Sequence, residues 1–577
     1  MHYPQLTPIP TETAFVDAFR GYNCNSRIGP GEFTHMENLS SDGYPVLMPR
    51  KKRGLYANPA SPQGLIAKEV LCYVDGTDFV IGTERIPMGL STAHEHNPKQ
   101  LISMGAYVLI FPDKKYINTA APEDRGHMEA RFSAEEATLI PCDGEGAERT
   151  ATFTQAQTPE NPQNGDYWLD TGTQPHSLKQ YSAATQMWTF IESTFLKLTA
   201  PGIGADFSRG DGVTLRGLPE GFATSAVIQA RGEDFLVIPG LLTEEKTLET
   251  PVTVQRTLPD MDFVVESGNR LWGCRYGTDE TGQTLNRLYA SKLGDFRNWN
   301  CFQSISTDSY YVNLGSDGPF TGAVNYLGSP LFFKENCLHR IFGTQPSDFS
   351  VQDTPCRGVQ PGCHRSLAIV GETLFYKSRS GVFAFDGSLP RLASYALGNA
   401  GYSEAVGGSH GAKYYISMAG ETGHHLFVYD TARSLWHRED GLKVTAFASH
   451  GGELFAIDGS KNRILALLGS AEPVEDRVHF LAQTGELGLS GPEMKYISRI
   501  TLRLFLAPGS RLEIDAQYDG EDRWEPLAVI HQSDLRSFTV PIRPRRCDFL
   551  RLRFRGEGDM KLYSLAKTIE KGSVYSP

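Results

Sequence analysis

The chain has 577 residues, of which 40% are hydrophobic and 21% are charged, and its formal net charge at pH 7 is −12. A chain of this length is expected to divide into several domains, and its composition excludes global disorder. The net charge excludes a protein that binds nucleic acid over its whole surface. Residues 495–577, however, contain 15 Lys and Arg against 11 Asp and Glu. Any contact with a polyanion is therefore expected near the C-terminus.

The residue types favour β-structure and argue against a secreted disulfide scaffold. The 58 Gly and 34 Pro favour turns, and the 24 Tyr and 31 Phe favour strands. The nine Cys are an odd number without a Cys-x-x-Cys motif, so neither a disulfide framework nor a structural zinc site is expected. The N-terminus lacks the basic and apolar regions of a signal peptide, and the longest apolar runs are too short to span a membrane. We therefore expect synthesis in the cytoplasm, no membrane insertion and no cofactor.

Residues 1–60 are polar, rich in Pro and Gly, and show little periodicity. They are interpreted as an extended N-terminal docking arm that becomes ordered on a neighbouring subunit. The arm carries a basic run that has two interpretations, a solvated charge cluster or a docking strip for an acidic partner. The run consists of Arg50, Lys51, Lys52 and Arg53.

A repeated unit begins near residue 65, in which a turn Gly or Asp precedes a short apolar strand, a second turn and another strand. A repeat of about 40 residues with four short strands is typical of the blades of a β-propeller. The sequence predicts six or seven blades. Residues 61–140 are expected to form the first blades, and residues 255–473 the remaining blades. The clearest units start near Gly268, Gly328, Gly371, Gly411 and Gly451.

Residues 141–254 interrupt the repeat and predict inserted β modules, a three-stranded aromatic mini-domain followed by a small barrel. The aromatic residues of the mini-domain are Trp168, Tyr181 and Trp188. These rings are expected to fill a very small core. The alternative is that one ring is exposed and stacks on a host glycan, assisted by Asp166 or Asp170.

Residues 474–577 contain alternating strands at the spacing of a β-sandwich. Alternation places Arg551, Arg553 and Arg555 on one face of a strand, while Leu552 and Phe554 point into the sandwich. One interpretation is a solvated face with cross-strand carboxylate partners such as Glu513 or Asp515. The other interpretation is a contact with the acidic rim of a neighbouring propeller. Direct DNA binding by these arginines is disfavoured, because tight phosphate contacts would stop DNA from sliding through a conduit. The candidate contact residues here are Arg543, Arg545, Arg546, Arg551, Arg553 and Arg555.

Motifs for enzyme chemistry are lacking. The sequence has no Gly-Lys-Ser/Thr phosphate loop and no Gly-x-Ser-x-Gly nucleophile motif. The His94-Glu95-His96, His424-His425 and Cys363-His364 pairs each lack a second ligand pair at fixed spacing, so no metal site is expected. A propeller glycosidase would need paired carboxylates, but the candidates lie at blade turns, where Asp usually bonds its own backbone. These candidates are Asp295, Glu335, Asp386 and Asp430.

Several short segments of the chain carry a resemblance to a known family. They are Gly29–Phe33, Met36–Leu39, Tyr44–Gly54, Ala290–Trp299, Phe332–Glu335, Gly358–Gln360 and Phe383–Pro390. These segments resemble the packaged-DNA stabilisation, or tail hub and nozzle, proteins of short-tailed bacteriophages, including those encoded in prophages of gut bacteria. The segment around Gly165-Asp166-Tyr167-Trp168 resembles small modules inserted in phage tail and fibre proteins. The resemblance implies a non-enzymatic propeller subunit of a ring below the portal.

The expected function is therefore that of a structural subunit of a phage neck or tail, located in the virion. Its expected partners are copies of itself, other neck or tail proteins, and DNA that passes through an acidic lumen without tight binding. One alternative is a receptor-binding or baseplate protein that contacts host glycans. A second alternative is a propeller glycosidase.

Overall fold

The computed structural model describes residues 11–92, 99–192, 194–248, 250–279, 282–488, 494–543 and 545–571. Regular structure in these residues consists of β-strands and two short 3-10 helices, η1 (His364–Ser366) and η2 (Tyr395–Leu397). Within these ranges no helix is long and apolar enough to cross a membrane. The chain divides into two compact units. Unit 1 contains Met1–Lys99, Phe333–Leu338 and Pro355–Pro577, and unit 2 contains Gln100–Phe332 and His339–Thr354.

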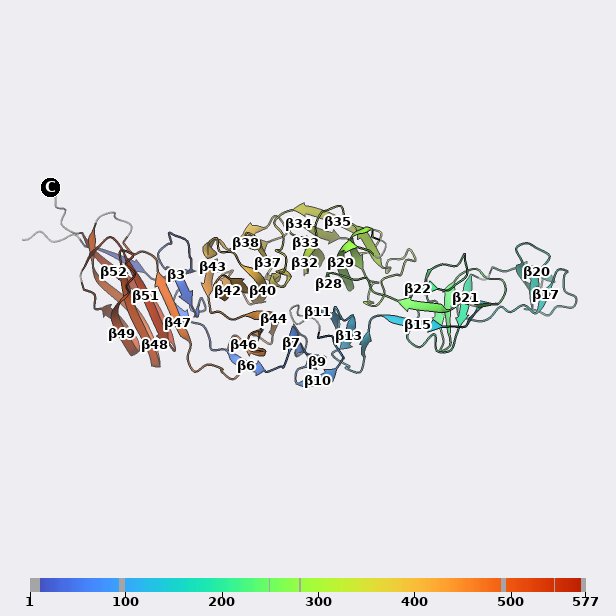
Figure 1. Cartoon of the computed structure of the whole chain (residues 1–577), viewed down its shortest axis with the longest axis horizontal. Helices are drawn as coiled ribbons and strands as arrows, with labels where there is room; N and C mark the ends of the chain where they lie inside the picture. The colour runs from blue at the N-terminus through green and yellow to red at the C-terminus, as the bar shows by residue number, and fades with distance from the viewer. Residues whose placement is uncertain are drawn as a thin grey trace, which may run out of the picture. The chain divides into compact units, whose positions relative to one another are not determined.

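The prediction of an all-β propeller with an inserted β module and a C-terminal β-sandwich is confirmed (Figure 1). Seven four-stranded sheets share one plan, in which each strand pairs with its neighbour in the chain. The first three comprise β7 (Pro62–Ala67), β8 (Leu71–Asp75), β9 (Asp78–Ile81) and β10 (Glu84–Pro87); β11 (Gln100–Met104), β12 (Tyr107–Phe111), β13 (Lys115–Asn118) and β14 (Arg125–His127); β28 (Phe263–Ser267), β29 (Arg270–Thr278), β30 (Thr284–Ala290) and β31 (Tyr310–Asn313).

The remaining sheets follow the same plan, except that the last borrows a strand from near the N-terminus. They comprise β32 (Phe320–Tyr326), β33 (Ser329–Lys334), β34 (Cys337–Phe342) and β35 (Ser350–Pro355); β36 (Ala368–Val370), β37 (Thr373–Ser378), β38 (Gly381–Phe385) and β39 (Arg391–Leu392); β40 (Ser403–His410), β41 (Lys413–Gly420), β42 (Gly423–Asp430) and β43 (Leu435–Arg438); β44 (Val444–His450), β45 (Glu453–Asp458), β46 (Arg463–Ala466) and β6 (Gly54–Ala57).

The glycines that marked the repeats occupy the turn between the first two strands of a sheet. Gly371 joins β36 to β37 with φ of 62°, and Gly411 joins β40 to β41 with φ of 56°. Residues with a Cβ rarely adopt this conformation, so these turns favour Gly. In unit 1 the first strands of neighbouring sheets pack together, β36 with β40, β40 with β44 and β44 with β7; in unit 2, β11 packs with β28 and β28 with β32.

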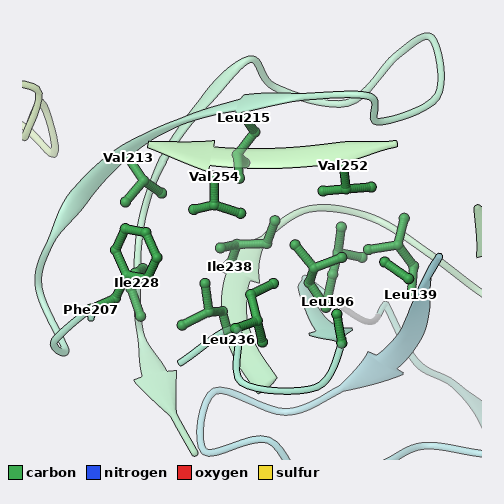
Figure 2. Close-up of a cluster of buried hydrophobic side chains, with 14 of the residues drawn as sticks. Leu139, Leu196, Phe207, Val213, Leu215, Ile228, Leu236, Ile238, Val252 and Val254 are labelled. Atoms are coloured by element: carbon green, nitrogen blue, oxygen red, sulfur yellow. The ribbon is translucent and has the colours of Figure 1, made fainter. Parts of the chain in front are cut away.

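The insertion contains one module inside another. Its outer part is a small barrel-like pair of sheets around a shared core that includes Leu196, Val213, Leu236 and Val254 (Figure 2). One sheet comprises β15 (Ala130–Ala134), β27 (Val252–Arg256), β22 (Gly212–Arg216) and β23 (Ser225–Val227). The other comprises β24 (Ala230–Arg231), β25 (Phe235–Pro239), β21 (Phe195–Thr199), β16 (Ala137–Cys142) and β26 (Lys246–Leu248).

The aromatic mini-domain lies in the chain between β16 and β21 and has four strands, not the three predicted. The extra strand, β17 (Phe153–Gln155), has only three residues and pairs parallel with β18 (Tyr167–Asp170), so no local periodicity marks it. The other strands are β19 (Ser177–Ser182) and β20 (Met187–Phe190). The insertion also starts earlier than predicted, because Ala130 in β15 pairs with Arg256 in β27 across more than a hundred residues of chain.

The C-terminal sandwich is built around one long strand, β48 (Lys495–Tyr518). Its first part pairs with β52 (Met560–Lys571) and its second part with β51 (Leu550–Glu557). The strand order is β1-β52-β48-β51-β47-β3-β2, and two further strands pair with β48. The other members are β1 (Thr11–Val16), β2 (Gly21–Tyr22), β3 (Glu32–Glu37), β47 (His479–Thr484), β49 (Glu525–Val540) and β50 (Arg546–Cys547); β4 (Leu39–Ser40) and β5 (Met48–Pro49) form a separate two-stranded sheet.

The prediction of an extended docking arm is wrong for residues 11–57. β1 pairs with β52, β3 pairs with β47, and β6 completes the sheet that contains β46, beside which it lies in Figure 1. These partners lie about four hundred or more residues further along the chain, and several of the strands have six residues or fewer. Local periodicity cannot reveal such pairs, so the segment looked unstructured in the sequence. Residues 1–10 lie outside the described residues.

Candidate functional site

Two residues of the predicted docking strip are buried in an ion-pair cluster within unit 1. Arg53 is 5% exposed, and its guanidinium donates to Glu439 at 2.7 Å and to Asp440 at 2.7 and 3.1 Å. Arg50 donates to Glu475 at 2.5 and 3.1 Å, and the Arg53 amide donates to the same carboxylate at 2.8 Å. We call these five residues the buried cluster. It joins the N-terminal segment, the chain after β43, and the linker between β46 and β47.

The pKa directions match the pairing in the buried cluster. Burial alone would lower the pKa of Arg53, but the carboxylates of Glu439 and Asp440 outweigh burial and raise it. Burial alone would raise the pKa of Asp440 and of Glu475, but the neighbouring arginines hold both below their ordinary values. Arg53, Asp440 and Glu475 are therefore charged at neutral pH. Neither proposed role of the basic run fits Arg50 or Arg53, since both are buried and paired inside their own chain. Lys51 and Lys52 are exposed.

The arginines of β51 form a half-exposed ladder whose carboxylate partners lie within the sandwich. Arg553 and Arg555 both donate to Asp515, at 3.0 and 3.1 Å. Arg555 also pairs with Glu513 at 3.1 Å, and Arg551 pairs with Glu486 at 2.5 Å. We call Arg551, Arg553 and Arg555 with these three carboxylates the arginine ladder. The cross-strand partners named by the first interpretation are present, so the ladder has little uncompensated charge to offer a neighbour.

The remaining basic candidates lie on the surface near β50. Arg543, Arg545 and Arg546 are exposed. Arg545 pairs with Glu521 and lies 5.1 Å from the centre of the Tyr518 ring. A role for these residues in subunit contact stays a prediction.

In the aromatic mini-domain Trp168 fills the core, as the preferred interpretation expected. Trp168 is 4% exposed, and its indole N–H donates to the Gln155 carbonyl at 2.8 Å. Trp188 packs at its edge, with ring centres 5.4 Å from Trp168 and 5.3 Å from Tyr181. Asp166 accepts from the Gln163 amide at 2.8 Å within its own loop. Trp168 is therefore not available to stack on a sugar.

Asp170 is likewise occupied, by the Gly172 amide at 2.9 Å and the Lys179 amine at 2.8 Å. The carboxylates considered for glycosidase chemistry are also used locally. Asp295 accepts from the Arg297 amide at 3.0 Å, and Asp386 accepts from the Ser388 amide at 3.2 Å. Asp430 accepts from Ser41 Oγ at 2.7 Å, and Glu335 pairs with Arg379 at 2.8 Å. The Asp295 and Asp386 contacts match the turn capping that the sequence predicted for aspartates at blade turns, whereas Glu335 pairs with a basic side chain and Asp430 also bonds a distant serine.

No group of three His, Cys, Asp or Glu side chains suited to a metal ion occurs in the described part of the chain. His94, Glu95 and His96 lie outside the described residues. His424 faces Glu404 at 3.7 Å, and burial lowers the pKa of His424 and of His425. Cys363 Sγ accepts from the Ala405 amide at 3.5 Å, and burial raises the pKa of the Cys363 thiol.

A Ser–His–Asp chain that the sequence did not reveal lies in unit 2. Ser316 Oγ lies 3.0 Å from His339 Nε2, and His339 Nδ1 lies 2.5 Å from Asp353 Oδ1. These contacts match the order of a hydrolase triad, but the solvent exposure is inverted. The His339 side chain is 0% exposed against the Phe320 ring, whereas the Asp353 side chain is 55% exposed. The arrangement ties the loop after β31 to β34 and β35, and the residues are too far apart in sequence for any motif to show them.

Unit 1 contains a polar cavity of about 600 Å³, lined from β7, β40 and β44 and the segments beside them. Arg365 and Lys443 contribute positive charge, and Glu404 is the acidic side chain among its lining residues. Burial lowers the pKa of Arg365 to about 10 and that of His364 to about 4, so His364 is neutral at pH 7. This cavity is therefore lined mainly by basic and neutral polar groups, and the expected acidic lumen of a ring of subunits stays a prediction.

No family model and no curated protein matches the chain. Among solved structures, BamB from Moraxella catarrhalis is 8% identical, with 73% of this chain and 97% of that chain covered and a TM-score of 0.31. AztD from Citrobacter koseri is also 8% identical, with coverages of 70% and 93% and a TM-score of 0.27. An exo-beta-1,3-galactanase from Phanerochaete chrysosporium is 9% identical, with coverages of 53% and 94% and a TM-score of 0.20. Similarities this weak carry no argument about activity.

Proposed function

We propose that this chain is a non-catalytic structural subunit of a bacteriophage neck or tail, and that copies of it assemble into a ring. The proposal combines the phage-like segments of the sequence with one structural observation. Large apolar side chains are exposed in groups on the outermost strands of two sheets, where a propeller meets its surroundings. Grouped exposed apolar residues mark interaction surfaces, whereas single ones are ordinary.

The first group, which we call the β39 patch, lies in unit 1. Leu389, Leu392 and Tyr395 are 62%, 48% and 73% exposed and fall within seven residues of one another. Leu392 belongs to the outermost strand of its sheet, because β39 pairs only with β38. Exposing such an apolar cluster to water is unfavourable, so contact with a neighbouring protein is the simplest explanation for it.

The second group, which we call the β31 patch, lies in unit 2. Phe302, Ile305 and Tyr311 are each about half exposed, and the rings of Phe302 and Tyr311 are 5.8 Å apart. The Arg287 guanidinium lies 4.8 Å from the centre of the Tyr311 ring. Aromatic residues with an adjacent Arg are typical of the energetic centres of protein interfaces. Two different patches suit a head-to-tail contact between copies, which generates a ring when the rotation closes.

Two observations weigh against the alternatives. The turn carboxylates bond backbone amides or basic side chains, which leaves no free pair of carboxylates among those considered for a glycosidase. The burial of Trp168 removes one of the three rings considered for stacking on a host sugar. The expected passage of DNA through the lumen of the ring stays a prediction.

The test measures the assembly state of the full chain by light scattering after size exclusion, followed by electron microscopy. We expect rings of one subunit number for the natural chain and a shift to monomers for Leu392→Asp with Tyr395→Asp. Leu327→Asp, which changes an exposed leucine outside both patches, should leave the rings intact. A natural chain that stays monomeric at high concentration would overturn the ring. Antibody labelling that fails to find the chain in phage particles would overturn the virion role.

A further inference from the structure

The sandwich in unit 1 encloses a cavity of about 300 Å³ beside β1, independent of the surfaces described above. Its apolar lining includes the rings of Phe19, Phe33 and Phe554 and the side chain of Leu565, all buried. Phe19 and Phe33 are stacked with ring centres 6.0 Å apart. The lining comes from two strands that pair with different parts of β48, since Phe554 lies on β51 and Leu565 on β52.

One charged side chain points into this apolar space. Lys567 lies between Leu565 and Ile569 on β52, and all three share a face because side chains alternate along a strand. Leu565 and Ile569 are buried, and Lys567 pairs in register with Ile500, which is also buried. Lys567 therefore faces the sandwich interior. Its amine forms no hydrogen bond or ion pair within the described ranges.

The charges around Lys567 do not neutralise it. Burial lowers the pKa of the Lys567 amine, the carboxylate of Glu12 opposes that shift, and the ammonium of Lys495 adds to it. Glu486 at the cavity pairs with Arg551 at 2.5 Å, and Glu32 accepts from the Gly29 amide at 2.6 Å. Arg27 is exposed at the cavity lining. Lys567 is partly buried. A partly buried ammonium without a close partner is less well solvated than one in water, and an anion beside it offsets that loss.

We propose that this cavity binds an aliphatic carboxylate, with the carboxylate at Lys567 and the hydrocarbon chain against the three phenyl rings. The cavity volume corresponds to about ten water molecules, which suits an acyl chain of about eight carbons. Apolar walls with one polar anchor are the usual design of small-molecule sites. The site does not depend on the proposed function, since it lies inside the sandwich and uses none of the patch residues.

The experiment measures binding to the full chain by calorimetry with octanoate, octan-1-ol and octylammonium as probes. We expect saturable octanoate binding, octan-1-ol binding weaker by about tenfold or more, and no binding of octylammonium. Lys567→Met keeps the apolar stem, removes the partly buried charge, and should fold at least as well as the natural chain. It should bind octanoate about tenfold or more weakly than the natural chain. The matched control, Lys561→Gln, changes an exposed lysine of the same strand and should bind octanoate normally.

Three outcomes would overturn the assignment. Equal affinities for octanoate and octan-1-ol would make Lys567 irrelevant to recognition. Unchanged octanoate binding by a folded Lys567→Met protein would place the carboxylate elsewhere. Binding of peptides that end in an apolar residue, with no binding of octanoate, would assign the cavity to a protein chain end instead. Each result is readable in a monomer or a ring, so none depends on the assembly state.

Discussion

The buried cluster and the arginine ladder use the same chemistry in different surroundings. Both pair arginines with Asp and Glu of distant segments at distances of about 2.5 to 3.1 Å. The Arg50 and Arg53 side chains are almost fully enclosed, whereas Arg551 and Arg555 remain partly in water. The sequence left two interpretations open for each group, a solvated charged surface or a contact with a partner. The buried cluster and the arginine ladder differ in burial, and burial determines how much each ion pair contributes to the stability of the fold.

Burial changes the consequence of losing one partner. An exposed pair contributes little, because water solvates each charge nearly as well as the partner does. A buried pair contributes a modest net energy while it is intact, but removing one member leaves a charge without solvent or partner. The buried cluster should therefore hold the N-terminal segment, the β40–β43 sheet and the linker to the sandwich as one body. The arginine ladder should act mainly on local strand alignment.

The largest effect is expected from Arg53→Met. This change leaves the buried Glu439 and the partly exposed Asp440 without their main counter-charge, so the free energy of unfolding should fall by about 3–5 kcal/mol. The measurement is the urea midpoint followed by circular dichroism. Lys52→Met changes the exposed neighbour and should cost less than about 0.5 kcal/mol. A loss of under about 1 kcal/mol for Arg53→Met would show that the cluster is not a buried network.

A smaller effect is expected from acid. In the folded chain the pKa values of Asp440 and Glu475 lie below the ordinary values for these residues. At a pH just below the ordinary pKa values, these two carboxylates therefore bind fewer protons in the folded state than in the unfolded state. Their contribution is complete above about pH 4.5 and is lost as the pH falls through their lowered pKa values. The test compares urea midpoints of the natural chain and Arg53→Met from pH 7 to pH 3. The difference between the two proteins should shrink at acid pH, and a constant difference would contradict the linkage.

The sequence revealed features with a local period and missed those made by distant segments. The blade repeat was visible because turn glycines such as Gly371 and Gly411 recur about every 40 residues and occupy the same turn in each sheet. The pairing of Arg553 with Asp515 was visible because strand alternation fixes the face of each residue. The strands β1, β3 and β6 were invisible, since their partners lie about four hundred or more residues away.

The candidate site shows the same division. Glu439, Asp440 and Glu475 could not be assigned to Arg50 and Arg53 from sequence, because nothing local connects them. The contacts of Ser316, His339 and Asp353 likewise depend on which strands become neighbours. Lys567 could have been found, since it breaks the apolar alternation of Leu565 and Ile569. That signal was present in the sequence, but a single lysine in a strand is ordinary without the cavity beside it.

The smallest effect is expected in the arginine ladder. Arg555→Gln should lower the free energy of unfolding by less than about 1 kcal/mol, because its side chain is nearly half exposed. Arg553→Gln should cost slightly more, since the Arg553 guanidinium also lies 4.3 Å from the centre of the Trp524 ring.

Salt distinguishes the ladder from the buried cluster. Raising NaCl from about 0.05 M to about 0.5 M should remove most of the effect of both ladder variants while leaving that of Arg53→Met almost unchanged, because screening acts on charges that solvent reaches. Urea midpoints at the two salt concentrations provide the measurement. The contrary result would be an Arg555→Gln variant that loses as much free energy of unfolding as Arg53→Met and is equally insensitive to NaCl. Solvent exposure would then not separate the two groups. The ladder would have to be enclosed by a contact that the single chain lacks.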